Sequence, residues 1–518
     1  VAPEAVVYTA TAGTANPYAY GLKSEIVDGK LNANFALNTD ATAVTVNVLD
    51  AEGEIVETIE QGAQTKGNYT AEINVSEYEK GNYTWEVEVA GAEKANIERY
   101  VSHRFYHPSG LDIDNNPENA SFGALFVAEG YNQGKTSNST GTYVSAQPNG
   151  AFGGGLYIFD AAGNQILNKE GTARFYPSWL TNQDRNLGVS SKTVGADFAK
   201  VAIAQDGRIF VNRYNFSGDY YLVAENLETL VSTGEFTSLL AGKTMTDGIY
   251  FEGTEYLAGP AQSFDVFGAG EDLKLLALSR ADNTVDATYD ENRVVEYALG
   301  TGTALEVPTA VAALDQKYTI SYDRKANLQY DNRGGIWYIQ YRGAPSAEQP
   351  ALVYVDANGE ITFFEGAGGK SRYQGAMSVS PDGKHLVASS ASGVATVYTI
   401  IRAENGDITL NEDYRLTHNM GGSLYSAAWD AAGNFFLGNA SNEVVQGYAV
   451  PRTEAAVTPA AAKYAFSTEN VGINKVAVDN DEDAPVEYYN LQGVKVENPS
   501  NGIYIKVQGK KSTKVYIK

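Results

Sequence analysis

The stretch GAMSVSPDGKHLVASSASGVATVYTI, residues 375–400, decides the fold of this chain. Hydrophobic and polar residues alternate at 377–379 and again at 386–388, and a Pro-Asp-Gly turn at 381–383 separates the two runs. Alternation on both sides of an Asp-Gly turn predicts two half-buried antiparallel strands, and residues 394–400 predict a third. One small sheet cannot bury both of its faces, so the fold depends on whether the pattern recurs.

The hairpin pattern recurs as VAIAQDGRIFV at 201–211, LQYDNRGGIWYI at 328–339 and AAWDAAGNFFL at 427–437. The turn glycines of the last two, together with Gly383 between them, follow one another at steps of 49 and 50 residues. Repeats of about 40–50 residues with four short strands are typical of β-propeller blades. We therefore predict an all-β chain whose residues 99–452 form a propeller of six or seven blades, with six preferred. A closed ring also protects the sheet edges.

The connections between the predicted strands differ in length on the two faces of the ring. In a four-stranded blade, the first-to-second and third-to-fourth turns lie on one face, and the other connections lie on the opposite face. Here the first kind are mostly short, with residues 279–292 as the exception. The second kind contain the long segments 130–154, 171–196, 259–270, 303–318 and 342–348. Long loops on a rigid scaffold are common binding sites, so we expect a ligand on this second face, called the loop face.

Aromatic and planar side chains are frequent in the segments of the loop face. Flat side chains beside amides and carboxylates suit a sugar ring or a peptide backbone, because apolar faces stack and polar groups bind hydroxyls. We therefore predict a glycan or protein ligand. The alternative for each single aromatic residue is that it anchors its loop onto the blades. The candidate ligand-binding residues are Tyr131, Tyr143, Phe175, Tyr176, Trp179, Arg185, Phe264 and Arg342.

A second candidate site is GLDIDNNPE at 110–118, where carboxylates and amides occupy alternate positions. This alternation is similar to a calcium loop and makes Asp112, Asp114 and Asn116 candidate metal ligands. The alternative is an inner strand followed by its turn, since the segment aligns with the other blades and lacks the glycine and distant glutamate of a helical calcium loop. We expect no cofactor, with calcium as the alternative.

Motifs for catalysis are not evident in the sequence. Of the four histidines, His103 and His107 would suit a shared face, but no third metal ligand accompanies them. There is no Gly-x-Ser-x-Gly elbow, phosphate-binding loop or dinucleotide fingerprint. Paired carboxylates for glycosidic cleavage stay open, because in a propeller they would come from different blades.

A small β-sandwich is predicted within residues 1–98. The hairpin VNVLDAEGEIV at 46–56 and the strand GNYTWEVEV at 81–89 resemble the Ig-like domain of flagellar hook-capping proteins. The resemblance implies a spacer or docking module rather than a catalytic domain.

The middle of the chain resembles NHL-type and related six-bladed propellers. The hairpins VAIAQDGRIFV and MSVSPDGKHLV and the strand FGALFVAEG at 122–130 carry this resemblance. Some relatives are lactone hydrolases or lyases with a metal on the propeller axis, and many others only bind. No catalytic residue is carried over, because these motifs specify a fold and not an activity.

The composition of residues 453–485, rich in Ala, Thr and Pro and then in Asp, predicts a linker, and residues 486–518 predict a small β-module. YNLQGVKV at 489–496, GIYIKV at 502–507 and the Lys-rich last strand resemble the C-terminal sorting domain of proteins exported by the type IX system. The resemblance implies passage across an outer membrane to the surface or the medium. The alternative is a plain terminal module that packs on the propeller.

The charge of the 518-residue chain restricts its partners. Its formal net charge is −25, which argues against a nucleic-acid partner and against an anionic membrane. No hydrophobic run approaches a membrane span. Cysteine is absent, which excludes disulfides and thiolate zinc sites. The chain begins at Val1 rather than Met, so we expect that an export signal has been removed.

These observations favour an exported or surface-exposed bacterial binding protein, monomeric and non-catalytic, that presents the loop face to a glycan or a surface protein. The alternative is a propeller hydrolase or lyase that acts on a carbohydrate or a lactone with acidic side chains and a divalent cation near the axis. A purely architectural surface component is the third possibility.

Overall fold

The structure is a computed structural model that is almost entirely β. It describes residues 6–8, 10–105, 107–130, 154–177, 198–213, 221–239, 248–251, 254–257, 263–281, 293–302, 305, 309–310, 327–339, 352–364, 375–390, 394–416, 424–451, 457–468, 485–491, 493–508 and 511–518. Helix in these ranges is limited to α1 (Leu227–Thr233) and a 3-10 turn, η2 (Gly270–Asp272). None of the described helices is long and apolar enough to cross a membrane. The predicted all-β class is therefore confirmed.

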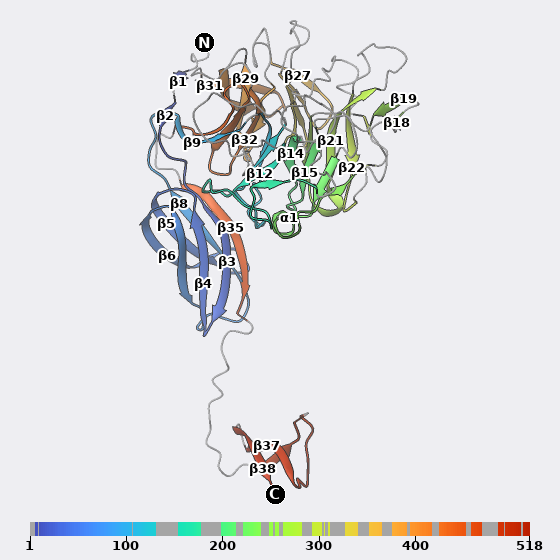
Figure 1. Ribbon diagram of the computed structural model, residues 1–518. Helices are drawn as coiled ribbons and strands as arrows, with labels where there is room; N and C mark the ends of the chain where they lie inside the picture. The colour runs from blue at the N-terminus through green and yellow to red at the C-terminus, as the bar shows by residue number, and fades with distance from the viewer. Residues whose placement is uncertain are drawn as a thin grey trace.

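An Ig-like β-sandwich lies beside the propeller (Figure 1). One sheet has the strand order β3-β4-β7 and the other β35-β8-β5-β6. Leu31, Val46 and Trp85 are fully buried between the sheets, and burial of such side chains is the main stabilising contribution to a small sandwich. The strands are β3 (Ala19–Val27), β4 (Lys30–Leu37), β5 (Ala41–Leu49), β6 (Ile55–Gln64), β7 (Gly67–Asn74), β8 (Asn82–Ala90) and β35 (Val457–Ser467).

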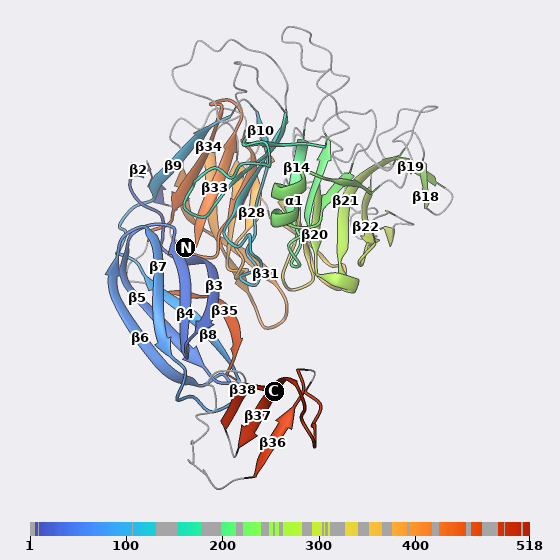
Figure 2. The ribbon, with the colours of Figure 1, turned by 60° about the horizontal axis from the view of Figure 1, so that its bottom comes forward.

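Strand β35 corrects the predicted linker at 453–485, because Val457–Ser467 belong to the Ig-like domain. The strand pairs antiparallel with β8, from Val457 opposite Ala90 to Ser467 opposite Asn82, and Figure 2 shows it beside β8 and β3. Its register shifts between Thr458 and Ala461, around Pro459. Proline is tolerated there because β35 is an edge strand and because the ladder is irregular at this point, so no N–H is required of the proline. The propeller is therefore inserted into the Ig-like domain between two paired strands.

Six sheets make up the described part of the propeller, each with four antiparallel strands at its centre, and additional strands extend three of them. In five of them the strands pair in chain order. The sixth takes its fourth strand, β9 (Glu98–Arg104), from the N-terminal side of the propeller. A hairpin of β18 (Gly248–Phe251) and β19 (Thr254–Leu257) extends the third sheet.

The remaining strands of these sheets are β10 (Pro108–Ile113), β11 (Leu125–Glu129), β12 (Gly155–Phe159), β13 (Arg174–Phe175), β14 (Phe198–Ile203), β15 (Ile209–Arg213), β16 (Tyr221–Ala224), β17 (Thr237–Ser238), β20 (Phe264–Phe267), β21 (Lys274–Ala281), β22 (Arg293–Ala298), β23 (Thr309–Ala310), β24 (Asn327–Tyr330), β25 (Ile336–Ile339), β26 (Leu352–Val355), β27 (Ile361–Phe363), β28 (Met377–Val379), β29 (His385–Ser390), β30 (Val394–Arg402), β31 (Ile408–Leu416), β32 (Leu424–Trp429), β33 (Asn434–Asn439) and β34 (Val444–Ala449).

The innermost strands of the six sheets form a closed circle. Strands β10, β14, β20, β24, β28 and β32 contact one another in this order, and β32 contacts β10 again. The pairing of β9 with β34 joins the first and last segments of the propeller within one sheet. This closure defines a β-propeller, because each sheet packs between two neighbours.

Several strands of the ring are buried on both faces, whereas the sequence predicts half-buried strands. Every residue of β11, β12 and β33 is buried. The polar positions of the alternating pattern therefore lie between sheets and need hydrogen-bond partners. Buried Asn434, for example, donates to Asp430 Oδ2 at 2.7 Å. The half-buried pattern holds better in the Ig-like domain, for example along the second half of β7.

The Ig-like domain packs against the face of the ring that carries the first-to-second and third-to-fourth turns, here called the turn face. Phe122 and Ala432 from two of these turns share a hydrophobic cluster with Tyr18. The rings of Tyr18 and Phe122 meet edge to face with centroids 5.8 Å apart. The backbone N–H of Asn16 donates to Asn434 Oδ1 at 2.7 Å. Apolar contacts and hydrogen bonds therefore fix this interface.

Two short strands near the N-terminus also belong to the propeller rather than to the Ig-like domain. β1 (Val6–Tyr8) runs parallel to β31, and β2 (Thr11–Ala12) runs parallel to β9. The start of the chain thus covers the outer edges of two neighbouring sheets. Covered edges protect a β-protein from pairing with other chains.

The C-terminal module is a three-stranded antiparallel sheet of β36 (Val486–Tyr489), β37 (Gly502–Gln508) and β38 (Lys511–Ile517). Several of its large hydrophobic side chains are exposed, among them Leu491, Val494 and Ile503.

Candidate functional site

Two of the candidate residues of the loop face are core residues. Phe175 and Phe264 are only 1% and 4% exposed. Phe175 in β13 packs between the first and second sheets, and Phe264 in the inner strand β20 meets Tyr221 edge to face at 5.4 Å. The prediction that these two rings contact a ligand is therefore wrong, because they fill the space between neighbouring sheets. Five further candidates lie outside the described residues: Tyr131, Tyr143, Trp179, Arg185 and Arg342.

Tyr176 is the remaining candidate, and it is half-buried directly after β13. The guanidinium carbon of Arg174 lies 4.2 Å from the centre of its ring. Arg174 is itself buried, and its Nε donates to the carbonyl of Gly154 at 2.6 Å. One face of the Tyr176 ring is thus covered by a fixed cation, so a ligand would have to use the other face.

A pocket of about 520 Å³ opens on the turn face, where inner strands of five sheets end. We call it the axial pocket. Asp112, Asp265 and Gln329 from three of these strands line it together with the rings of Phe267 and Tyr330. The two rings are tilted with respect to each other, with centroids 5.5 Å apart. The pocket thus combines aromatic surface with carboxylate and amide groups.

The polar residues of the inner strands connect neighbouring sheets. Asp112 Oδ2 accepts a hydrogen bond from the backbone N–H of Ile203 in β14 at 2.7 Å. Asp265 Oδ2 accepts one from a backbone N–H of β24 at 2.7 Å, and Gln329 Oε1 accepts one from a backbone N–H of β28 at 2.8 Å. Trp429 Nε1 in β32 donates to a carbonyl of β28 at 2.9 Å. These bonds hold the pocket wall in one geometry before any ligand arrives.

Burial raises the pKa values of the two axial carboxyl groups. The pKa of Asp265 rises to about 7 because the group is removed from water, although two backbone N–H donors act in the opposite direction. The pKa of Asp112 is also well above its ordinary value, mainly through burial and secondly through the negative charge of Asp265. A carboxyl group with a pKa near 7 exchanges its proton at neutral pH. Asp265 can therefore accept a hydrogen bond in one state and donate one in the other.

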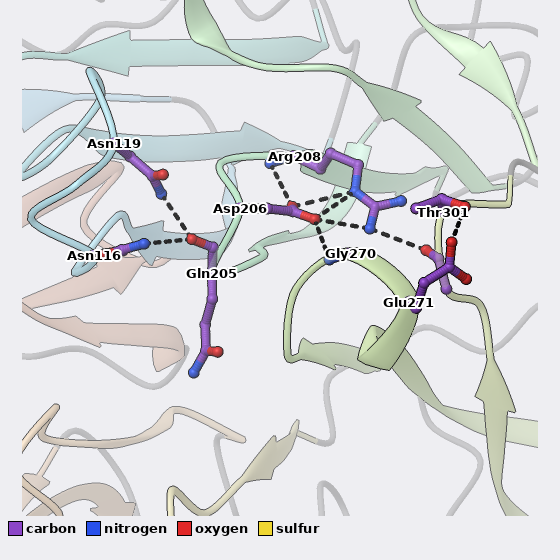
Figure 3. Close-up of polar contacts among 9 residues, drawn as sticks. Asn116, Asn119, Gln205, Asp206, Arg208, Gly270, Glu271 and Thr301 are labelled. Atoms are coloured by element: carbon purple, nitrogen blue, oxygen red, sulfur yellow. Dashed lines mark hydrogen bonds and ion pairs between the residues drawn. The ribbon is translucent and has the colours of Figure 1, made fainter.

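Contacts between turns fix the rim of the axial pocket (Figure 3). The side-chain amides of Asn116 and Asn119 donate to the carbonyl of Gln205 at 2.5 and 3.3 Å. The next residue, Asp206, pairs with Arg208 at 2.8 Å, and its Oδ2 accepts from a backbone N–H of η2 at 2.9 Å. The side-chain amide of Gln205 extends away from the residues drawn, and no described residue bonds to it. Gln205 lines the axial pocket, so its amide is a candidate ligand contact.

The candidate calcium ligands have structural partners. Residues 110–118 form the end of β10 and its turn, as the alternative interpretation predicts. Asp114 accepts hydrogen bonds from the N–H of Asn116, the amide of Asn119 and the hydroxyl of Ser121. Asp112 accepts from the backbone N–H groups of β14 and of its own neighbour. Within the described ranges, no three His, Asp or Glu side chains form a group that would hold a metal.

Sequence reasoning missed Asp265, Gln329, Phe267 and Tyr330. A signal for the first two exists, because Leu-Asp-Ile at 111–113, Phe-Asp-Val at 264–266 and Leu-Gln-Tyr at 328–330 place a polar residue between two hydrophobic ones on three inner strands. An alignment of the hairpins by these triplets would have predicted an axial ring of polar side chains.

Comparison with known proteins gives one family match. Residues 23–93 match the FlgD Ig-like domain family, which confirms the resemblance inferred for that segment. No curated protein matches the chain. A similar solved structure is the β-propeller domain of Cps50 (Swd1) from Myceliophteria thermophila, 10% identical, which covers 68% of this chain and 99% of that chain with a TM-score of 0.34. The propeller assignment therefore rests on the sheet topology described above.

Proposed function

We propose that this protein is an exported, non-catalytic binding protein whose propeller holds a glycan in the axial pocket. The observation that carries the proposal is the composition of that pocket, where Phe267 and Tyr330 lie near carboxylate and amide side chains. Sugar rings stack their apolar faces on aromatic rings and bind carboxylates and amides through their hydroxyls. The hydrogen bonds between the inner strands preorganise the wall, which lowers the entropic cost of binding.

The other parts of the chain support attachment rather than chemistry. The Ig-like domain serves as a spacer on the turn face, and the C-terminal module, with its resemblance to sorting domains, directs export to the cell surface or the medium. The loop face is the second proposed contact region, for the same glycan or for a surface protein, through Tyr131, Tyr143, Tyr176 and Trp179.

A glycan array probed with the full chain tests the proposal. For a glycan that is retained, we expect Phe267→Ala and Gln205→Ala each to weaken binding by about fivefold, since stacking and a hydrogen bond each contribute about 1 kcal/mol. Asn405→Ala, an exposed turn amide outside the pocket, is the matched control. Retention of no glycan, or full affinity in both pocket variants, contradicts the axial site. A loss confined to Trp179→Ala would move the site to the loop face, and a loss on calcium chelation would add a metal to it.

A hydrolase or lyase is the second candidate, and the proton exchange of Asp265 opposite Asp112 favours it. A general acid works best with a pKa near the working pH. Against it stands the use of both carboxyl groups as acceptors for backbone N–H groups of neighbouring sheets. Incubation with the retained glycan, followed by mass spectrometry of products, separates the two functions. Turnover that is lost in Asp265→Asn while binding persists would establish the enzyme.

A further inference from the structure

A second cavity lies between the Ig-like domain and the turn face. It measures about 320 Å³ and we call it the interdomain cavity. Its apolar wall consists of Val101 in β9, Leu125 in β11, and Phe159 and Phe436 from two other strands of the ring. Its polar side includes residues of the Ig-like domain. Cavities of this size at domain boundaries are frequent small-molecule sites.

Three polar side chains that line the interdomain cavity have no hydrogen-bond partner for their polar atoms among the described residues. Tyr18 is 2% exposed, and no described residue forms a hydrogen bond with its hydroxyl. The same holds for the hydroxyl of Tyr100 and for both ring nitrogens of His103, within the described part of the chain. Tyr18 is buried and Tyr100 and His103 are partly buried, so three side chains with unused hydrogen-bonding capacity among the described residues surround one cavity.

Neighbouring residues, among them a glycine that leaves room for its hydroxyl, fix the position of Tyr18. Gly123, which also lines the cavity, adopts φ +77°, and a Cβ at this position would lie 2.7 Å from the Tyr18 hydroxyl oxygen. The rings of Tyr18 and Phe122 meet edge to face, and the backbone N–H of Tyr18 donates to Asn38 Oδ1 at 2.7 Å. These contacts with Gly123, Phe122 and Asn38 fix the position of Tyr18 at the cavity wall.

His103 is held as a neutral imidazole. Its ring stacks on Phe159 with centroids 4.1 Å apart and planes 18° apart. Burial lowers the pKa of His103 to about 4, so at neutral pH one ring nitrogen donates and the other accepts. Its sequence neighbour His107 lies elsewhere, with its ring 5.1 Å from that of Tyr425, so the two histidines do not form one site.

The charges around the cavity disfavour an anion. The carboxylates of Asp430 and Asp160 lie close enough to raise the pKa of the Tyr18 hydroxyl, after burial as the larger cause. The one cationic side chain in the wall, Lys66, donates to the carbonyl of Ala162 at 2.5 Å. A bound anion would lie near two negative charges and would have to displace this contact.

We propose that the interdomain cavity binds a small uncharged ring compound that carries hydroxyl groups. The ring lies against the apolar wall, and its hydroxyls bond to Tyr18, Tyr100 and His103. Because the cavity wall comes from both domains, the ligand stabilises their contact. This site is separate from the axial pocket and independent of the proposed glycan.

Ligand-observed NMR and thermal unfolding of the full chain test this proposal with glucose, myo-inositol and resorcinol as neutral probes. Glucuronate and 2,6-dihydroxybenzoate are the matched anionic probes. At least one neutral probe is expected to bind saturably and to raise the unfolding midpoint, and its anionic counterpart to bind about tenfold more weakly. The triple variant Tyr18→Phe, Tyr100→Phe, His103→Phe keeps the rings and removes the polar atoms. It is expected to bind about tenfold more weakly or worse, with no lower midpoint in the absence of probe.

Three results would overturn the proposal: no saturable binding of any neutral probe, equal binding of the anionic probes, or undiminished binding by the triple variant. The single variants Tyr18→Phe and Tyr100→Phe decide the matter if the triple variant does not fold, because each removes one oxygen atom only. Asn405→Ala, at an exposed turn outside both cavities, is expected to leave probe binding unchanged. A loss in Phe267→Ala alone would assign the binding to the axial pocket instead, which separates this inference from the proposed function.

Discussion

Replacement of Asp265 by Asn tests whether the axial carboxyl group carries a proton in the folded protein. The asparagine has the shape of a protonated carboxyl group and keeps an oxygen that can accept the backbone N–H of Tyr330. The pKa of Asp265 is raised from its ordinary value to about 7 by burial. The folded state therefore retains the proton over a pH range in which the unfolded chain has already lost it.

The sign of the effect follows from this difference. Below pH 4 both states are protonated and Asp265 has no effect on stability. Between about pH 4 and pH 7 only the unfolded state ionises, so the wild-type protein loses stability as the pH rises, by about 1.4 kcal/mol per pH unit. The total above pH 7 is about 4 kcal/mol, which for a propeller of about 350 residues corresponds to about 6 °C in the unfolding midpoint.

Thermal unfolding at pH 4.5 and pH 8, followed by calorimetry so that the propeller transition is resolved from others, measures the effect. We expect Asp265→Asn to raise the propeller midpoint relative to the wild type at pH 8 and to change it much less at the acidic pH. Asp407→Asn, at an exposed turn of the same ring, is the matched control. An Asp265→Asn variant that follows the wild-type pH profile would refute the reasoning, because it would mean that the carboxyl group is ionised throughout.

Three further substitutions test the ring and its contact with the Ig-like domain by thermal unfolding. Asp331→Ala removes the acceptor that Arg402 and Trp337 share, and is expected to lower the free energy of unfolding by about 3–5 kcal/mol. Glu412→Ala, the control, breaks an exposed pair with Arg415 and is expected to cost about 0–1 kcal/mol. Equal effects of the two substitutions would contradict the argument. Gly123→Ala is expected to destabilise the protein more than Gly171→Ala, because both glycines have positive φ but only the methyl added at Gly123 meets a neighbour. Gly171→Ala is expected to cost about 1 kcal/mol of unfolding free energy. Limited proteolysis between the domains provides a second measurement of the domain contact. Gly110→Ala places a methyl 2.6 Å from the backbone of Lys200 on the next inner strand and is expected to cost about 3 kcal/mol or more of unfolding free energy. The control Gly67→Ala is expected to cost less than about 1 kcal/mol. An unchanged midpoint in Gly110→Ala would exclude the close approach of β10 and β14.

The propeller was predictable because each of its tight turns requires a residue with positive φ, and glycine therefore recurs at these turns. Gly207, Gly334, Gly383 and Gly433 all adopt positive φ, between +69° and +85°, in the turns that the sequence pattern identifies. A residue other than glycine is strained in that conformation, so the tight hairpins leave a regular trace in the sequence. The Ig-like segment was predictable for a similar reason, through its alternating strands and its resemblance to a known family.

The sites were less predictable because they depend on contacts between segments far apart in the sequence. Asp265 lies outside the recurring hairpins that the sequence pattern identifies, and its partner in β24 lies 65 residues further along the chain. The interdomain cavity combines Tyr18 with His103 and Phe436, and no sequence pattern relates these residues. Aromatic content alone also misleads, since Phe175 and Phe264 serve as core residues.

The insertion of the propeller between β8 and β35 has a consequence for a chain without cysteine. The two ends of the ring leave and return at Ala90 and Val457, which are paired neighbours in one sheet of the Ig-like domain. While that sheet is intact, the ring can unfold only as a closed loop, and a closed loop has less conformational entropy to gain than a free chain. The pairing of β8 with β35 thus restrains the unfolded ring as a disulfide would, although the restraint is reversible. If the chain were cut within the ring, the two fragments would stay together as long as β8 and β35 remain paired.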